Sequence, residues 1–374
     1  MQPNFLRDNS PANVDVYSVT ADYEQPTKNG ALEMGFKTSF TKTDNNVLWE
    51  LNNGAGWKND FGKTNHFIYK ENVNAIYVTK TTTIKKWELE TGLRLEQTNT
   101  EGNSVTNNQI NKRNYFDFFP NIAASFTNKK NNSLSLSYRK SIQRFGFDYV
   151  NPFIIYENAY AYRQGNPNLL PQKNHELSAT VSIKNALYLG VSYIKALKAL
   201  GASYKPSATT NISSYDNFNS SDFYYVFVSY GKQVLPFWQS NISASAGLYK
   251  LNIPQTSTSK KTTPNPFLSG SVQNSFTFKK GFSAELTAAF QSGIATGIFV
   301  NKGYFTMDAG VSKSFQKNKI VARVSCSDIF NTLVSNVDVN YVGVIQNKRS
   351  KTETRFLNLS VKYRFGNIVV RDKI

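Results

Sequence analysis

Apolar and polar residues alternate strictly along many stretches of this 374-residue chain, and this alternation limits the folds open to it. The clearest case is residues 87–96. One face carries Trp87, Leu89, Thr91, Leu93 and Leu95, and the other carries Glu88, Glu90, Gly92, Arg94 and Glu96. A period of two is typical of a β-strand with one face in an apolar environment. Since about fifteen such stretches follow one another, the sequence predicts an all-β protein.

The connections between these stretches alternate in length. Short connections, such as 128–132 and 184–185, alternate with long connections, such as 98–112 and 201–221. Outer-membrane barrels have short periplasmic turns and long extracellular loops, whereas a soluble β-sandwich has no physical reason to sort its loops by length. A strand of about ten residues spans a bilayer when tilted by ~45°. We therefore expect a transmembrane antiparallel up-and-down β-barrel of about 14–16 strands. A soluble sandwich that buries the apolar faces against each other is the alternative.

Residues 145–177 interrupt the alternation with a long aromatic segment that contains Pro152, Pro167 and Pro171. Proline lacks the N–H that a sheet ladder needs, so no central strand is expected to run through this segment. Its many aromatic side chains are equally untypical of a flexible linker. The sequence predicts an ordered loop that joins two amphipathic strands.

The composition fits strands with one apolar and one polar face. Charged residues make up 18% of the chain and aromatic residues 14%, and the formal net charge is +18. The lysines concentrate near the predicted turns, as in Lys129-Lys130 and Lys279-Lys280. This is typical of strand ends at a membrane boundary, and no zinc-finger, RNP or helix-turn-helix pattern indicates nucleic-acid binding.

Residues with catalytic or metal-binding chemistry are few. Cys326 is the only cysteine and lies in an alternating strand, while His66 and His175 do not have the spacing of a metal-binding pair. We expect no metal site, no cofactor and no enzymatic activity. Asp328, which lies in an Asp-Ile-Phe-Asn stretch, is expected to form a turn at the end of a strand.

Several segments resemble the C-terminal barrel of TonB-dependent outer-membrane receptors, in the form common in Bacteroidetes. The segments that carry this resemblance are Gly92–Thr98, Phe119–Asn121, Ser137–Arg144, Asn151–Phe153, Gly165–Pro171, Ser327–Asn331 and Tyr363–Gly366. The most specific are Asn151–Phe153 and Gly165–Pro171. One departure is Gln143-Arg144, where the family more usually has Arg-Pro. The plug domain and TonB box of the family have no counterpart in this chain.

The resemblance implies a place in the cell outer membrane. Large transporters of this kind have about 22 strands around a plug, so we expect residues 1–366 to be the C-terminal portion of such a wall and 367–374 to be a tail. It also implies energy-coupled uptake of a large nutrient, such as a metal–siderophore or an oligosaccharide. The implied partners are outer-membrane lipid, the nutrient ligand, the inner-membrane TonB system through a plug domain outside this chain, and a surface lipoprotein. A non-transporting barrel that acts as a scaffold, adhesin or assembly partner is the alternative.

The candidate functional residues fall into two groups. Seven charged residues are expected to face the lumen: Glu88, Glu90, Arg94, Glu96, Arg139, Lys362 and Arg364. Three tyrosines are expected in an extracellular loop: Tyr156, Tyr160 and Tyr162. The competing interpretation of the charges is a polar lumen wall or a plug salt bridge. For the tyrosines it is packing within the loop or a membrane girdle.

Overall fold

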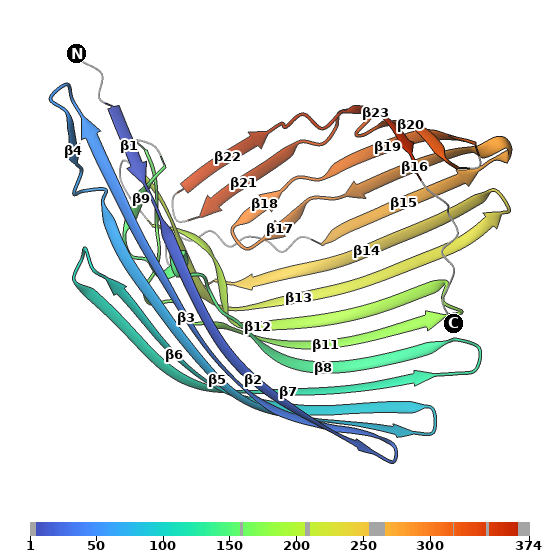
Figure 1. The fold of residues 1–374 in the computed structure, drawn as a ribbon, viewed down its shortest axis with the longest axis horizontal. Helices are drawn as coiled ribbons and strands as arrows, with labels where there is room; N and C mark the ends of the chain where they lie inside the picture. The colour runs from blue at the N-terminus through green and yellow to red at the C-terminus, as the bar shows by residue number, and fades with distance from the viewer. Residues whose placement is uncertain are drawn as a thin grey trace.

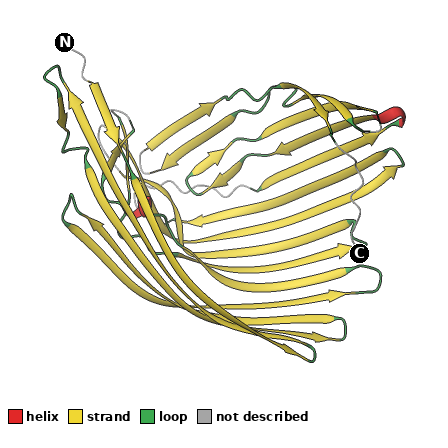
Figure 2. Ribbon diagram, in the orientation of Figure 1, coloured by secondary structure: helices red, strands yellow, loops and turns green. Residues whose placement is uncertain are grey.

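The computed structural model describes residues 5–157, 160–205, 210–253, 266–316, 318–341 and 344–365. Strands make up almost all of it, as the yellow arrows of Figure 2 show. The main sheet holds 19 strands. Four of these, β1, β4, β9 and β10, are short side pairings, which leaves fifteen that follow one another in antiparallel order and form what we call the wall (Figure 1). The predicted all-β, antiparallel up-and-down architecture is confirmed.

The fifteen wall strands are β2 (Ala12–Thr27), β3 (Gly30–Asn52), β5 (Asn65–Ile84), β6 (Trp87–Ser104), β7 (Gln109–Thr127), β8 (Ser133–Gln143), β11 (Gln172–Ile183), β12 (Leu187–Lys205), β13 (Asn211–Leu235), β14 (Trp238–Asn252), β15 (Phe267–Thr277), β16 (Phe282–Gln291), β19 (Tyr304–Phe315), β20 (Ile320–Cys326) and β23 (Leu357–Tyr363). The side strands are β1 (Phe5–Asn9), β4 (Trp57–Asn59), β9 (Ile154–Tyr156) and β10 (Ala161–Gln164). A second, 4-stranded sheet holds β17 (Ile294–Thr296), β18 (Phe299–Asn301), β21 (Ser335–Tyr341) and β22 (Val344–Ser350). Two short helices are α1 (Phe147–Val150) and η1 (Lys279–Gly281).

Apolar side chains of the wall are more exposed than the polar side chains opposite them. Ile76 and Phe118 lie in one row across the strands and are 59% and 54% exposed. Glu96 and Asp117 lie in the next row, on the other face, and are only 6% and 4% exposed. A soluble sandwich would bury the apolar row between two sheets, so this arrangement excludes that alternative. The apolar row faces outward, as it does in a barrel surrounded by lipid.

Short turns gather at one end of the wall, at the right and bottom of Figure 1, and the longer connections gather at the other end. Two of the predicted long loops are nevertheless mostly strand. β6 continues to Ser104 and β7 begins at Gln109, so the expected loop 98–112 shrinks to residues 105–108. β12 and β13 likewise extend into the expected loop 201–221. Strand ends that project beyond lipid need no apolar outer face, and they therefore lack the alternation on which the prediction depended.

Pro120 lies inside β7, where a proline typically marks a bulge or a local break. The register between β6 and β7 runs through it without a shift, with Leu93 opposite Pro120. On the other side of β7, however, the ladder to β8 starts only at the pair Asn121–Arg139. Proline has no N–H to give to that neighbour. The break is therefore real on one side of the strand, and residues 109–120 have no strand partner in the described residues on that side.

Residues 144–171, which we call the inserted segment, cover this break. The rings of Tyr149 and Tyr215 stack at 3.7 Å and join the segment to β13. On the opposite side, the Arg113 guanidinium of β7 donates hydrogen bonds to the carbonyl oxygens of Pro167 and Leu169. Leu169 is completely buried. The prediction of an ordered aromatic loop is confirmed, and its role in the fold is to bridge two groups of strands that do not pair.

The second sheet, called the inner sheet here, packs on the wall near β12 and β13. Phe218 of β13 and Tyr341 of β21 meet edge to face at 6.3 Å. Ala199 and Val339, both buried, belong to the same apolar cluster. No helix in the described ranges is both long and apolar enough to cross a bilayer.

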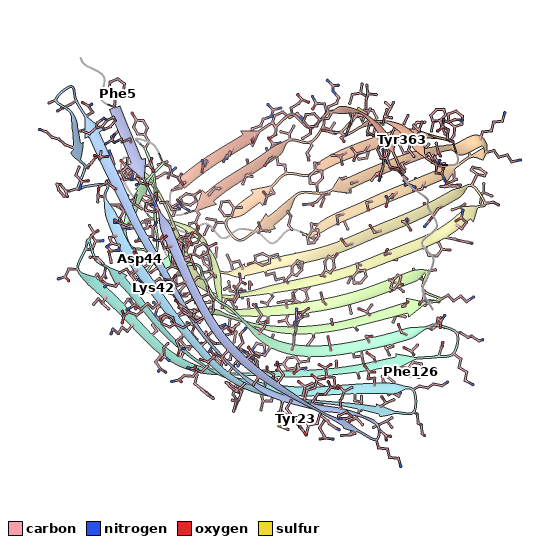
Figure 3. All side chains as sticks on the ribbon, viewed as in Figure 1. Phe5, Tyr23, Lys42, Asp44, Phe126 and Tyr363 are labelled. Atoms are coloured by element: carbon pink, nitrogen blue, oxygen red, sulfur yellow. The ribbon has the colours of Figure 1, made fainter. Side chains whose placement is uncertain are left out.

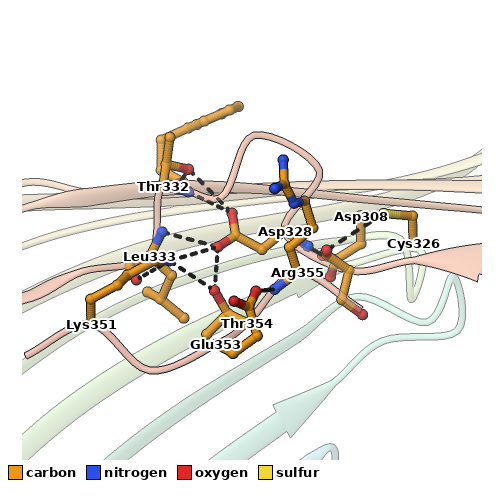
Figure 4. A network of polar contacts seen from close by, with 11 residues as sticks. Asp308, Cys326, Asp328, Thr332, Leu333, Lys351, Glu353, Thr354 and Arg355 are labelled. Carbon is orange, nitrogen blue, oxygen red and sulfur yellow. Dashed lines mark hydrogen bonds and ion pairs between the residues drawn. The ribbon is translucent and has the colours of Figure 1, made fainter. Parts of the chain in front are cut away.

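Asp328 fixes the path of the chain between β20 and the inner sheet (Figure 4). Its carboxylate accepts hydrogen bonds from the Thr354 hydroxyl at 2.5 Å and from the backbone N–H groups of Leu333 at 3.1 Å and Thr332 at 3.0 Å. Lys351 Nζ lies 3.8 Å away. Asp328 has a φ of +41°, which a short polar residue tolerates. The predicted turn at a strand end is confirmed.

The edge strands of the wall are β2, of 16 residues, and β23, of 7 residues. The registers of the described residues include no pairing between β2 and β23. The predicted tail 367–374 lies outside the described residues, and the wall of about 22 strands stays a prediction.

The outward direction of the apolar row can be tested with neighbouring residues of β12. Val191 is 54% exposed on the outer face, and Ser192 lies on the inner face. Val191→Arg should lower the free energy of unfolding from the bilayer by about 2–4 kcal/mol, because the charge would lie in lipid. Ser192→Arg should change it by less than about 1 kcal/mol. Urea titration of the protein folded in vesicles measures both, and equal effects would contradict the assignment of faces.

A second prediction concerns Asp328. Burial opposes its ionisation, but hydrogen bonds from Thr354, Leu333 and Thr332 outweigh this and lower the pKa of Asp328 to about 2. Because this folded pKa lies below the ordinary value of 3.8, the carboxylate stabilises the segment above about pH 4 and stops doing so as the pH falls through about 2. Asp328→Asn keeps a residue that tolerates positive φ but removes the charge.

At pH 7 this variant should increase amide exchange in residues 327–334 roughly tenfold, through loss of charge-assisted hydrogen bonds. Hydrogen–deuterium exchange measured by mass spectrometry reports it. Asp338→Asn, at an exposed pair with Lys302, is the matched control and should leave these amides unchanged. Unchanged exchange in the Asp328 variant would show that the carboxylate does not hold the segment.

Candidate functional site

The candidate site lies on the inner face of the wall, toward the end with the long connections. Two elements converge there: the inserted segment and the inner sheet (Figure 1). The inserted segment rests on β5–β7 and β12–β13, and the inner sheet rests on β12–β14. The sequence-predicted residues are distributed unevenly between this region and the rest of the wall.

Glu96 is the centre of a buried polar cluster. Arg94 Nε donates to Glu96 Oε1 at 2.6 Å, and Arg144 Nη2 donates to Glu96 Oε2 at 2.6 Å. Arg144 also donates to the Thr98 hydroxyl at 3.0 Å and lies 4.0 Å from Glu71. Because both carboxylate oxygens of Glu96 are occupied by guanidinium groups, the pair is satisfied within the protein. The cluster therefore anchors the start of the inserted segment and leaves little of Glu96 for a ligand.

A second buried pair anchors the far end of the inserted segment. Lys173 Nζ forms an ion pair with Asp117, which is 4% exposed. Lys173 immediately follows the start of β11, and Asp117 lies in β7. The pair thus joins two strands that no ladder connects, which is the same task that Arg113 performs.

The other charged candidates lie apart from this cluster. Glu90 accepts a hydrogen bond from Asn121 Nδ2 at 2.7 Å, and Glu88 is exposed near the short turn at 85–86. Arg139 Nη2 pairs with Glu176 at 2.6 Å across the β8–β11 ladder. Lys362 and Arg364 are exposed at the end of β23, and neither makes an ion pair with any described residue. The structure therefore brings together Arg94 and Glu96 but spreads the other five along the wall.

The three candidate tyrosines lie in the β9–β10 part of the inserted segment. The rings of Tyr156 and Tyr162 meet edge to face at 4.8 Å, and Lys63 Nζ lies 5.4 Å from the Tyr156 ring centre. Tyr160 is 75% exposed, and its carbonyl oxygen accepts a hydrogen bond from the Asn211 N–H at 2.7 Å. Packing within the loop accounts for Tyr156, whereas Tyr162 also borders open space.

That space is a cavity of about 360 Å³ between the inserted segment, the wall and the inner sheet. Five of its eleven lining residues carry aromatic rings or side-chain amides. The lining residues are Glu157, Ala161, Tyr162, Tyr204, Asn211, Ser213, Phe299, Val337, Val339, Gln346 and Lys348. Glu157 supplies one carboxylate and Lys348 one amine. The rest of the lining offers rings, aliphatic surface, and groups that donate or accept hydrogen bonds. Such a lining suits a ligand with flat apolar parts and several polar groups.

Sequence reasoning missed Arg144, Arg113, Asp117 and Lys173. Arg144 entered the sequence analysis only as the end of a segment that resembles the family and as a departure from its usual pattern, and Arg113 follows a predicted loop directly. Extending the alternation of β6 and β7 beyond residue 98 would have placed Glu96, Thr98 and Thr100 on one inner face. No group of three or more metal-binding side chains occurs in the described residues.

Solved structures similar to this chain are outer-membrane receptors and transporters. The ferric-catecholate import receptor Fiu of E. coli K12 has 13% identity and a TM-score of 0.64, and the match covers 96% of this chain and 55% of that one. The copper transporter OprC has 10% identity and a TM-score of 0.68, with 95% and 57% covered. The ferripyoverdine receptor of the outer membrane of Pseudomonas aeruginosa has 13% identity and a TM-score of 0.63, with 96% and 49% covered.

These likenesses show the fold, and this chain spans about half the length of the chains it matches. No curated protein matches the sequence. Residues 2–363, almost the whole chain, match a family of outer-membrane barrels. The protein is thus located in the outer membrane. It belongs to the outer membrane protein beta-barrel family.

Proposed function

We propose that this chain is the wall of an outer-membrane receptor that takes up a large nutrient, either a metal–siderophore or an oligosaccharide. The observation that carries the proposal is the cavity of about 360 Å³ bordered by the inserted segment, the wall and the inner sheet. Ligand pockets of this size, lined by aromatic rings and a few polar groups, are typical of small-molecule recognition. The neighbouring structures named for ferric and copper compounds favour the metal–siderophore class.

Tyr162 and Tyr204 are the residues proposed to contact the ligand. Tyr162 comes from the inserted segment, and Tyr204 lies in β12, where its hydroxyl donates to Gln346 Oε1 of β22 at 3.4 Å. The two rings thus border the cavity from separate elements. Glu96 and Arg94 act as a structural anchor in this proposal, because their charges are already paired. Lys362 and Arg364 are proposed lumen charges outside the cavity.

Energy coupling in this proposal comes from the inner-membrane TonB system, through a plug domain that is not part of this chain. A surface lipoprotein that delivers the nutrient is a further proposed partner. Both follow from the sequence resemblance, and uptake against a gradient needs an energy source that the wall itself does not contain.

Ligand binding to the purified protein in detergent tests the proposal. The probes are ferric catecholate, ferric citrate, ferripyoverdine and a series of malto-oligosaccharides, with isothermal titration calorimetry as the measurement. One probe class should bind, and Tyr162→Ala should weaken it roughly tenfold, the typical effect of removing a central aromatic contact. Tyr230→Ala, on the lipid-facing side of β13, is the matched control and should bind normally.

Failure of every probe to bind would overturn the transport proposal and favour the scaffold or adhesin alternative. Binding that is equally strong in the Tyr162 variant would place the ligand elsewhere in the lumen. Folding of each variant is checked by its heat-dependent gel mobility, so that loss of binding is not confused with misfolding.

A further inference from the structure

The seven short turns of the wall share an unusual charge pattern. They comprise residues 28–29, 85–86, 128–132, 184–186, 236–237, 278–281 and 316–319. Six of the seven contain at least one lysine, and none contains an aspartate or a glutamate. The nine described lysines in them are Lys28, Lys85, Lys86, Lys129, Lys130, Lys184, Lys279, Lys280 and Lys319. We call this set the basic rim.

No described residue neutralises the amines of the basic rim. All nine side chains are exposed, and the described residues offer none of them an ion pair or a side-chain hydrogen bond. The opposite end of the wall differs: there Lys63 pairs with Asp60, Lys70 with Glu101, and Lys302 with Asp338. Among the described residues, none of the nine rim amines is paired, whereas the opposite end holds paired lysines beside unpaired ones such as Lys58 and Lys348.

The turns form one continuous arc, because they connect consecutive strands of a single curved sheet (Figure 1). Adjacent strands lie about 4.8 Å apart, so neighbouring turns, two strands apart, lie roughly 10 Å from each other. An arc of amines at this spacing presents many positive charges to a flat anionic surface at once. A single small anion could reach only one or two of them.

Aromatic side chains mark the depth at which the basic rim lies. The rings of Trp87 and Phe126 are 5.2 Å apart, and those of Phe237 and Phe278 are 5.9 Å apart, all at or next to short turns. Figure 3 shows Phe126 and Tyr363 toward this end of the wall. Aromatic girdles lie at the membrane–water interface, so the turns just beyond these rings are at the level of the lipid headgroups.

Lys313 supports this placement. It lies on the outer, lipid-facing row of β19, opposite Phe282. Its Nζ sits 3.7 Å from the centre of the Phe282 ring and donates a hydrogen bond to the Lys280 carbonyl at 2.7 Å, in the adjacent turn. A lysine that buries its stem and directs its amine toward the interface is snorkelling. The boundary between lipid tails and headgroups therefore passes close to this turn.

We propose that the basic rim is a binding surface for anionic phospholipid headgroups of the periplasmic leaflet. Short turns of outer-membrane barrels face the periplasm, and clustered lysines beside a membrane bind anionic lipid electrostatically. The unpaired amines, their arc and the aromatic rings above them all fit a leaflet surface. The inference depends on the location in the outer membrane and not on the transported nutrient.

Quenching of tryptophan fluorescence by brominated lipids tests this. Trp87 and Trp238 both lie beside short turns, whereas Trp49 and Trp57 lie at the opposite end. With Trp49 and Trp57 replaced by phenylalanine, the remaining fluorescence reports which lipids contact the short-turn end. In vesicles, brominated phosphatidylglycerol should bind roughly fivefold or more in preference to brominated phosphatidylcholine. Raising the salt from about 0.05 M to about 0.5 M should weaken this preference, because the amines are exposed.

Two variants of equal charge change separate the basic rim from net charge. Replacing Lys85, Lys86, Lys129, Lys130, Lys279 and Lys280 by glutamine should abolish the preference. Replacing six lysines at the opposite end by glutamine should leave the lipid preference intact. These are Lys58, Lys63, Lys70, Lys112, Lys198 and Lys302. No preference in the unmodified protein, or the same loss in both variants, would overturn the inference. Binding of a polyglutamate peptide without any lipid preference would also overturn it, and would assign the rim to an acidic protein partner.

Discussion

The hydrogen-bond ladder between neighbouring strands is the constraint on which the rest of the structure depends. A backbone surrounded by lipid has no water to satisfy its N–H and C=O groups, so strands that cross the bilayer depend on pairing with their neighbours. Because the ladder satisfies the backbone, the side chains of the outer face are free to be apolar and exposed to lipid. Carboxylates such as Glu96 lie buried on the inner face. The need for pairing also makes any interruption of the ladder costly, and the interruption beside Pro120 is where the most elaborate packing occurs.

The inserted segment repairs that interruption with side chains. Arg144 and Arg113 tie its two ends to β6 and β7, and Tyr149 stacks on β13. Each guanidinium makes several directed hydrogen bonds in a fixed plane, which lets one side chain replace part of a missing ladder. Breaking one partner of such a buried pair leaves an unpaired charge and is strongly destabilising. The same segment also supplies Tyr162 to the cavity, so the bridge across the break and part of the candidate site are built by one segment.

The sequence was sufficient to predict the wall but not the interior. Period-two alternation identified strands such as 87–96 because the bilayer requires an apolar outer face along a strand that crosses it. Beyond the bilayer that requirement ends. The sequence therefore predicts loops where the structure has extensions of β6, β7, β12 and β13. The cluster of Glu96, Arg94 and Arg144 was predictable only in part, since Arg144 lies 48 residues from Glu96 along the chain. Such long-range pairing depends on how the strands curve, which local patterns do not encode.

The two ends of the wall solve different electrostatic problems. At the long-connection end, elements fold inward and meet one another, so charges such as those of Lys302 and Asp338 occur in pairs. At the other end the turns are too short to fold over anything, and their described lysines form no ion pair with a described residue. Like charges about 10 Å apart repel each other across the turns unless another body supplies counter-charge. Six of the seven turns contain lysines that repel one another in this way. The headgroups of the leaflet lie beside every turn at once, and they are therefore the proposed source of the counter-charge.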